Sequence, residues 1–289
     1  MEAVEIYVVQ LMHGLVYGML IFMVTSGLTL VLGMMGILNI THAAFYMLGA
    51  YFGYSLALSL NSFWLSLLIS PLIVSGLAVI IERFFLRGTY GGGHIPQVLL
   101  TFGLFFIISE LVRLIWGSTP LRLAEPALLE GGISFMGRVF PIYRLFIIGF
   151  SSLIFLAMAL LLLRTRIGVI IRAAVSDADM VEALGNNVPA YFVGVFAVGA
   201  FLAALAGVIA APLLSVFSGM GDQVLIDCFV VVIIGGFGSL VGALIASLMI
   251  GQLQAFGSLW FPELALVLQF LLMVVVLVIR PTGLLGEEI

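Results

Sequence analysis

The stretch from Tyr143 to Leu163 reads YRLFIIGFSSLIFLAMALLLL and decides the fold class of the chain. Arg144 is its only charged residue. A helix needs about 20 mostly apolar residues to cross the hydrocarbon core of a bilayer. We therefore expect this stretch to form a helix that spans a membrane.

Comparable apolar stretches follow one another along all 289 residues. Hydrophobic residues make up 64% of the chain, charged residues only 8%, and the mean hydropathy is +1.34. A soluble domain carries roughly 25% charged residues, so lipid must be the solvent for most of this protein. We expect one all-α domain, a bundle of eight or nine membrane segments spanning residues 1–289. The candidate segments are Tyr7–Leu32, Ile40–Leu60, Phe63–Leu86, Pro96–Trp116, Tyr143–Leu163, Ala190–Leu214, Val224–Ile234, Leu240–Phe256 and Leu264–Ile279.

The seventh segment, Val224–Ile234, is too short to cross a bilayer as a helix. It is bounded by Asp222 on one side and by the run GGFGS, residues 235–239, on the other. We interpret it as a part-helix that enters the membrane and breaks there. A boundary role is the plainer interpretation of Asp222 and Asp227, and the alternative is that either residue faces the external vestibule.

The arginines predict the orientation, because cytoplasmic loops carry an excess of basic residues. If the seventh segment counts as a crossing, six arginines share one side, which we expect to be cytoplasmic together with the C-terminus. These six are Arg83, Arg87, Arg164, Arg166, Arg172 and Arg280, and the opposite side receives Arg122, Arg138 and Arg144. Residues 117–142 then form an external loop, with a short hairpin or a surface helix.

Several kinds of chemistry are excluded or disfavoured by composition. All ten basic residues are Arg, so a phosphate-binding loop that ends in Gly-Lys-Ser/Thr is impossible. Ten scattered arginines are too few for a nucleic-acid surface. His13, His42 and His94 lie far apart in the sequence without accompanying Cys or carboxylate clusters, which argues against a metal site.

The stretch Arg164–Pro189, RTRIGVIIRAAVSDADMVEALGNNVP, lies on the Arg-rich side. Ser176 is a candidate N-cap, with Asp177 and Asp179 in the first turn, where the helix dipole favours acidic residues. Gly185-Asn186-Asn187 is a candidate stop signal. The pattern predicts a helix of about two turns between two membrane helices. The plainer alternative is a solvated loop.

Two membrane segments are interrupted by glycine. Residues 31–50 read VLGMMGILNITHAAFYMLGA and residues 233–252 read IIGGFGSLVGALIASLMIGQ. An offset of 202 positions places Gly33 and Gly36 on Gly235 and Gly238, which hints at a duplicated unit. Paired interruptions in two halves of a transporter indicate a solute path.

Close helix packing through small residues is the alternative reading of these glycines. The GGFGS run as a whole is expected to expose too much backbone for packing alone. For Asn39, the alternative is a cap on the helix that follows. The candidate path residues are Gly33, Gly36, Asn39, Thr41, His42, Gly235, Gly236, Gly238 and Ser239.

Glu110 and Arg113 lie three residues apart, so they share a helix face and are expected to pair. A proton or ion relay is the sharper alternative. We disfavour it, because the sequence indicates no other carboxylate deep in the membrane.

Four motifs resemble one protein family. LNITHAAFYMLGAYFG is similar to the N-x-x-H-G region near the start of permeases of the branched-chain amino acid ABC importer family. The stretch from Arg164 resembles the coupling region of that family, and GGFGSLVGALIASLMIGQ and VLVIRPTGLLG resemble two further signatures. The shorter, first-permease type is the closer likeness. One departure is Ala43, where the family usually has Gly after the His.

This resemblance implies a multi-subunit importer in a bacterial or archaeal cytoplasmic membrane. A second, homologous permease would pair with this chain, and two ATP-binding subunits would carry ATP and Mg, with no cofactor in this chain. An extracytoplasmic binding protein would deliver leucine, isoleucine or valine, or alternatively other amino acids, urea, amides or aromatic acids. The residues implied to contact the ATPases are Asp179, Glu182, Ala183, Leu184, Gly185 and Asn187.

Two other functional classes remain as alternatives. A secondary transporter or channel would need no ATPase, but it predicts intramembrane charges for ion coupling, and the sequence offers few. An intramembrane serine protease would require Ser239 to meet His42, but the sequence contains no Gly-x-Ser-Gly loop.

Overall fold

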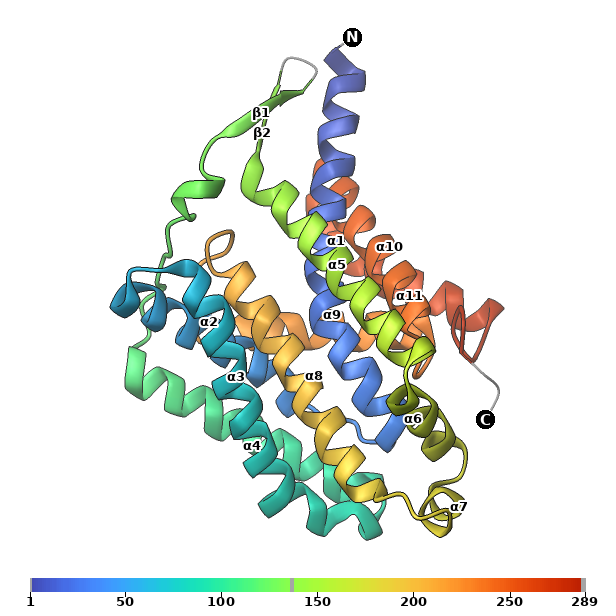
Figure 1. Cartoon of the computed structure of the whole chain (residues 1–289). Helices are drawn as coiled ribbons and strands as arrows, with labels where there is room; N and C mark the ends of the chain where they lie inside the picture. Colours follow the sequence, from blue (N-terminus) through green and yellow to red (C-terminus); the bar gives the residue numbers. More distant parts are fainter. Residues whose placement is uncertain (1, 136–137, 287–289) are drawn as a thin grey trace.

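The computed structural model describes residues 2–135 and 138–286, and its main feature is a bundle of long helices (Figure 1). The described residues form eleven α-helices and one two-stranded sheet, which confirms the predicted all-α membrane bundle. The helices are α1 (Glu2–Met35), α2 (Thr41–Leu60), α3 (Phe63–Ile81), α4 (His94–Trp116), α5 (Ile142–Arg164), α6 (Arg166–Ser176), α7 (Ala178–Ala183), α8 (Val188–Ala210), α9 (Met220–Gly235), α10 (Leu240–Trp260) and α11 (Ala265–Ile279).

Eight of the helices in the described part of the chain are long and apolar enough to cross a membrane. They are α1–α5, α8, α10 and α11, with α3 extended by a π-helical turn, Glu82–Leu86, and a 3-10 turn, Arg87–Gly92. Helix α11 has 15 residues and reaches 18 together with the 3-10 turn that precedes it, Pro262–Leu264. Helix α9 has 16 residues. At 1.5 Å per residue it is about 24 Å long, less than the roughly 30 Å hydrocarbon core. It is therefore the part-helix that its short apolar run predicts.

Helix α1 lies at the centre of the bundle. It packs against α5, α8, α9 and α10, and its residues Phe22, Met23 and Val31 are completely buried. The outer helices α4, α5 and α11 instead expose large apolar side chains such as Leu114 and Val278. In water such exposure would be costly, whereas in lipid it costs little, so these helices form the outer wall.

Glycine lets the central helices approach one another closely. A Cβ atom at Gly207 of α8 would overlap the backbone of Tyr46 in α2, and one at Gly49 of α2 would overlap Ala204 of α8. Gly251 of α10 meets the backbone of Gly18 in α1 in the same way. Small residues at such crossings increase van der Waals contact, which is the main attraction between helices in lipid.

The bundle has two distinct ends (Figure 1). The hairpin end carries the start of α1, the loop between α8 and α9, and the hairpin of β1 (Gly132–Phe135) and β2 (Arg138–Pro141). The α7 end carries α6, α7, the end of α3 and the segment 280–286. A bridge between Leu121 and Val216 ties two loops together at the hairpin end. The two predicted groups of arginines fall at opposite ends of the bundle.

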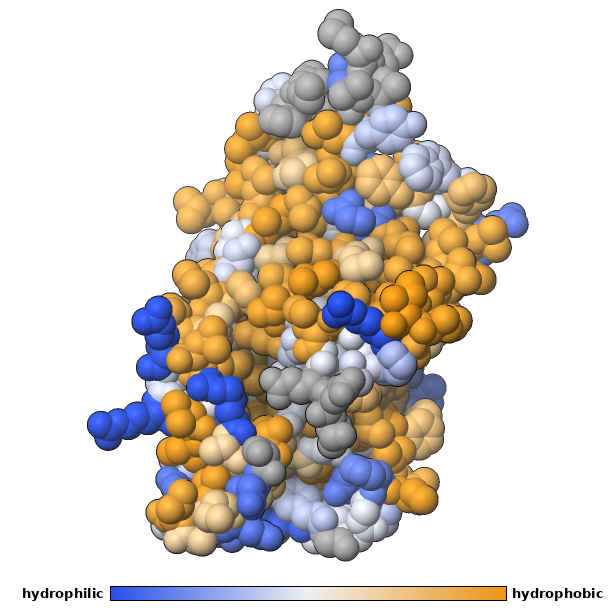
Figure 2. Space-filling model, turned by 90° about the vertical axis from the view of Figure 1, so that its right-hand side faces the viewer, coloured by the Kyte–Doolittle hydropathy of each residue, from blue (hydrophilic) through white to orange (hydrophobic). Residues whose placement is uncertain are grey.

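Hydrophobic side chains cover most of the face that Figure 2 shows, while hydrophilic side chains gather in its lower part, towards the α7 end. This distribution fits a molecule whose middle part is embedded in lipid.

Two predicted helix boundaries near the short segment are wrong. Helix α8 ends at Ala210 rather than at residue 214, because residues 211–219 turn to form the bridge at Val216. Helix α9 begins at Met220 rather than at residue 224. Asp222 therefore lies in the first turn of α9, where the helix dipole favours an acid, and Asp227 lies in the middle of the helix.

Candidate functional site

The predicted coupling stretch folds into two helices, α6 and α7. Thr165 caps α6 by accepting a hydrogen bond from the Gly168 N–H, at 3.2 Å. Asp177 caps α7, because its Oδ1 accepts from the Met180 N–H at 2.9 Å. The prediction that Ser176 is the cap is wrong. Ser176 is the last residue of α6, whereas Asp177 has the extended backbone that a cap requires.

One apolar residue anchors α7, and most of its surface is free. Val181 is 5% exposed, whereas Met180 is 58% and Leu184 is 73% exposed. All six residues implied to contact the ATPases are exposed, namely Asp179, Glu182, Ala183, Leu184, Gly185 and Asn187. Acidic and apolar side chains thus share one accessible surface at the α7 end.

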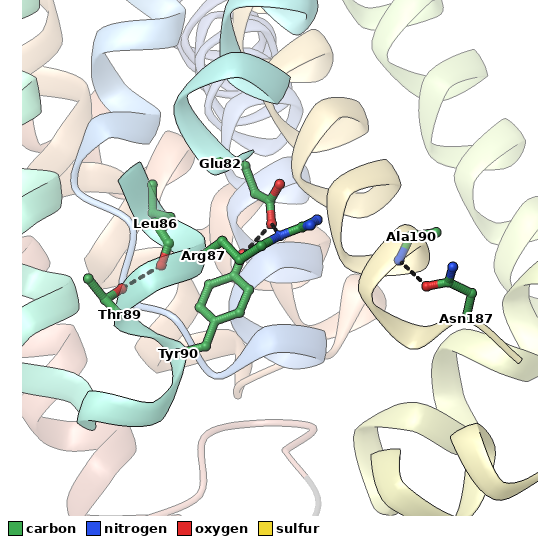
Figure 3. Close-up of polar contacts among 7 residues, drawn as sticks. All are labelled: Glu82, Leu86, Arg87, Thr89, Tyr90, Asn187 and Ala190. Carbon is green, nitrogen blue, oxygen red and sulfur yellow. Dashed lines mark hydrogen bonds and ion pairs between the residues drawn. The ribbon is translucent and has the colours of Figure 1, made fainter. Parts of the chain in front are cut away.

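The end of α7 is joined tightly to the start of α8. Gly185 has a φ of +85°, a left-handed conformation that glycine adopts without strain. The Asn187 side chain then caps α8 by accepting a hydrogen bond from the Ala190 N–H at 3.1 Å (Figure 3). Because so few residues separate the two helices, a displacement of α7 will move the start of α8.

A buried carboxylate lies beside the start of α8 (Figure 3). Glu82, in the π-helical turn after α3, accepts a hydrogen bond from the Tyr90 hydroxyl at 2.8 Å, and its Oε1 lies 3.5 Å from Arg87 Nε. The Tyr90 ring packs edge-on against Phe192 of α8, with centroids 6.3 Å apart. Glu82 is completely buried. Sequence analysis missed it, although a lone Glu inside the apolar third segment was a usable signal.

Within the first interrupted stretch, residues 31–50, the helix breaks at residues 36–40, which lead from the end of α1 into the interior. Thr41 donates to the Thr101 carbonyl in α4 at 2.9 Å, and His42 Nε2 donates to the Val24 carbonyl in α1 at 2.9 Å. Asn39 is buried, and neither atom of its amide group has a partner in the described part of the chain. Asn39 therefore does not cap α2, and it keeps free hydrogen-bonding groups beside the start of that helix.

The second interruption is covered by the segment 280–286. The Leu284 N–H donates to the Ile234 carbonyl at 2.8 Å, and the Leu285 N–H donates to the Gly235 carbonyl at 3.1 Å. Gly236 and Gly238 have positive φ angles of +93° and +77°. The expectation that this run exposes unpaired backbone is confirmed only in part. The Gly235 carbonyl is paired by a segment more than forty residues later, whereas Phe237 and Gly238 are exposed and the described residues supply no backbone partner for their N–H groups.

The two interruptions meet at one point. A Cβ atom at Gly33 would overlap Gly238, so these two backbones are in direct contact. Gly36, with a φ of +63°, instead lies near His94 at the start of α4. Gly235 packs against Gly242 of α10, and Ser239 caps that helix by accepting from the Gly242 N–H at 3.0 Å.

Asp227 occupies the buried middle of α9 rather than a boundary, which corrects the sequence interpretation. The Tyr17 hydroxyl of α1 donates to Asp227 Oδ2 at 2.8 Å. Gln269 of α11 lies beside the same carboxyl group. Asp227 also contradicts the premise that no other carboxylate lies inside the helix bundle, and Glu82 is a second buried carboxylate, at the α7 end. The predicted Glu110–Arg113 pair is confirmed, with 2.9 Å between oxygen and nitrogen.

Neither residue of the serine–histidine alternative is positioned to react with the other. The Ser239 hydroxyl caps α10 and His42 Nε2 binds the Val24 carbonyl. Both side chains thus have structural roles in different parts of the bundle.

Comparisons with known proteins agree over nearly the whole chain. A family model described as "Branched-chain amino acid transport system / permease component" matches residues 10–277. The high-affinity branched-chain amino acid transport system permease protein BraD of Pseudomonas aeruginosa is 30% identical over 297 residues, covering 97% of this chain and 96% of BraD. The corresponding protein LivH of Salmonella typhimurium is 27% identical over 296 residues, covering 96% of this chain and 95% of LivH.

Among solved structures, a chain of PsaBC from Streptococcus pneumoniae in complex with Fab is similar to this chain, and the match covers 92% of this chain and 89% of the PsaBC chain. Its sequence identity is 14% and its TM-score is 0.49, too low to support an argument. The sequence matches and the multi-pass helical architecture lead to one conclusion: the chain belongs to the family of permease components of branched-chain amino acid transport systems.

Proposed function

We propose that this chain is the membrane-spanning subunit of an ATP-driven importer for branched-chain amino acids such as leucine, isoleucine and valine. It would pair with a second, homologous permease, bind two ATP-binding subunits and receive its solute from an extracytoplasmic binding protein. The names of BraD and LivH, both high-affinity branched-chain amino acid permeases, support the solute class.

The exposed surface of α7 is the observation that carries this proposal. It combines the acidic residues Asp179 and Glu182 with exposed Met180 and Leu184 at one end of the bundle. Such a mixture suits docking to another protein better than solvation alone, because exposed large apolar groups favour burial. Asp177 caps the start of α7 and Asn187 caps the start of α8, so a movement of α7 is transmitted to α8.

In this proposal the α7 end faces the cytoplasm. ATP binding closes the two ATPases, α7 moves with them, and α8 transmits the motion to α1 and α2, against which it packs. The bundle alternates between outward-open and inward-open states. Separation of the Gly33–Gly238 contact would expose the interruptions and the free amide group of Asn39 to the solute.

Charge reversal on α7 tests the coupling role. We expect Glu182→Arg to prevent co-purification of the ATPase subunits and to abolish ATP-dependent leucine uptake in proteoliposomes. Glu263→Arg is the matched control, because Glu263 is an exposed glutamate at the hairpin end. Normal ATPase binding and uptake by both Glu182→Arg and Gly185→Trp would overturn the coupling assignment.

One observation favours a second candidate, an ion-coupled secondary transporter. The buried Asp227–Tyr17 pair places an ionisable group inside the membrane, where such groups commonly mark ion pathways. This candidate predicts uptake driven by a proton or sodium gradient in proteoliposomes without ATPase subunits, with loss of uptake in Asp227→Asn. Uptake that requires ATP and ignores both gradients would exclude it.

A further inference from the structure

A cleft of about 350 Å³ opens beside α1 at the hairpin end, between α1, α5 and α10. Its volume lies at the lower end of the roughly 300–1,000 Å³ range of small-molecule sites. His13, Tyr17, Arg144, Gln254 and Ser258 are among its lining residues. Six of its seven lining residues thus carry a polar side chain, in a chain that is otherwise strongly apolar.

The cleft lies below the level of the membrane surface. Tyr7, Phe256 and Trp260 pack together near the start of α1, as aromatic side chains do at a membrane interface. His13 follows Tyr7 by six residues and is therefore about 9 Å further along the helix axis. Charged and polar side chains at that depth face protein or a water-filled cavity rather than lipid.

Arg144 supplies a positive charge to the cleft. It is half-buried and donates a hydrogen bond through Nη1 to Nδ1 of His13. Among the side chains that the structure describes, which exclude Glu2, no carboxylate lies within 4 Å of it, and Glu125 acts on its charge only from further away. The guanidinium group has five N–H donors, so most of them remain available to an anion.

An unsatisfied acceptor lies in the same cleft. The Oε1 atom of Gln254 is buried and has no hydrogen-bond partner within the described residues. The neighbouring Tyr17 hydroxyl is already engaged with Asp227, and the Ser258 hydroxyl donates to the Ala255 carbonyl. A cation and a free acceptor in one small cleft are complementary to the two ends of a zwitterion.

We propose that this cleft binds the amino acid solute when it leaves the extracytoplasmic binding protein, with Arg144 pairing with the α-carboxylate and Gln254 Oε1 accepting a hydrogen bond from the ammonium group. A planar guanidinium matches a carboxylate with two parallel hydrogen bonds. This inference rests on the proposed function, since it takes the solute to be an amino acid.

Equilibrium binding to the complete, detergent-purified transporter tests the inference. Wild-type complex is expected to bind L-leucine and to discriminate against L-leucinamide, which lacks the carboxylate. Arg144→Gln should weaken leucine binding by about tenfold or more, the scale of a charge-assisted pair. Arg144→Lys keeps the positive charge but lacks the planar guanidinium group, so its affinity for leucine should lie between those of wild type and Arg144→Gln. Arg122→Gln is the control, since Arg122 is exposed at the same end.

Assembly with the ATPase subunits, measured in parallel, separates a local effect from misfolding. If Arg144→Gln does not assemble with the ATPase subunits, two other measurements test the inference. These are the leucine affinity of Arg144→Lys and the difference between leucine and leucinamide binding by the wild-type complex. Equal leucine affinity in Arg144→Gln and Arg122→Gln, or equal binding of leucine and leucinamide by wild type, would overturn the inference alone. Absence of any leucine uptake by the wild-type transporter would overturn the proposed function, and this inference with it.

Discussion

At the scale of single residues, Asp227, which accepts a hydrogen bond from Tyr17, is the residue that sequence analysis misplaced. The error came from the boundary of α9. The predicted segment began at Val224, four residues after the helix begins, so Asp227 lay close to the end of the predicted segment and was interpreted as a residue at the membrane interface. Tyr17 belongs to α1, 210 positions away, so no local pattern pairs it with Asp227. The Glu110–Arg113 pair, by contrast, was predictable from its spacing on one helix.

Removal of the Tyr17 hydroxyl should destabilise the protein. Tyr17→Phe leaves Asp227 Oδ2 buried without its donor, which typically costs about 1–3 kcal/mol. We expect a lower melting temperature of the purified protein in detergent. Tyr7→Phe is the control, because Tyr7 lies on the same helix and is exposed. Identical melting temperatures for the two variants would show that the Tyr17–Asp227 bond does not stabilise the fold.

At the scale of elements, the positions of the long helices were predictable because about 20 apolar residues are required for each crossing. The coupling helix was predicted as well, but with the wrong cap and without α6. Helix α6 is amphipathic, packs against α1 and α5, and buries Ile171 and Ala174. It owes its stability to these tertiary contacts, which the local sequence does not reveal.

Glycine at the crossing of α2 and α8 should be essential for packing. Gly207→Val would place a side chain against the backbone of Tyr46, which cannot move without separating the two helices. Overpacking of this kind costs about 1–3 kcal/mol or more. Gly194→Val on the same helix meets open space and serves as the control. We expect aggregation and a lower melting temperature only for Gly207→Val, and equal behaviour would argue against a tight crossing.

At the scale of the whole molecule, the two ends of the bundle carry different surfaces: the hairpin end carries the Arg144 cleft, and the α7 end carries the exposed surface of α7. The order of the segments and the distribution of arginines predicted which loops share an end. The contact between the two interruptions, and their closure by residues 280–286, was not predictable because the partners are far apart in sequence. For the same reason the Arg144 cleft escaped sequence analysis, since its walls come from α1, α5 and α10.

The proposed orientation can be checked by cysteine labelling in intact cells. Cys228 is the chain's single cysteine and is buried, so its background labelling should be low. Leu128→Cys at the hairpin end and Leu184→Cys at the α7 end replace leucines that are 77% and 73% exposed. In cells that express this chain without the ATPase subunits, which would otherwise cover Leu184, a membrane-impermeant maleimide should label the Leu128→Cys variant directly and the Leu184→Cys variant only after permeabilisation. The reverse pattern would contradict a cytoplasmic α7 end.

The hydrogen bonds from Leu284 and Leu285 to the carbonyl groups of Ile234 and Gly235 have a consequence for biosynthesis. During translation, the junction between α9 and α10 leaves the ribosome more than forty residues before the segment that pairs with it. Until that segment arrives, these carbonyls remain unpaired, and an unpaired backbone group in lipid costs several kcal/mol. Nascent chains interrupted before residue 280 should therefore be substrates for membrane proteases that remove incompletely folded proteins.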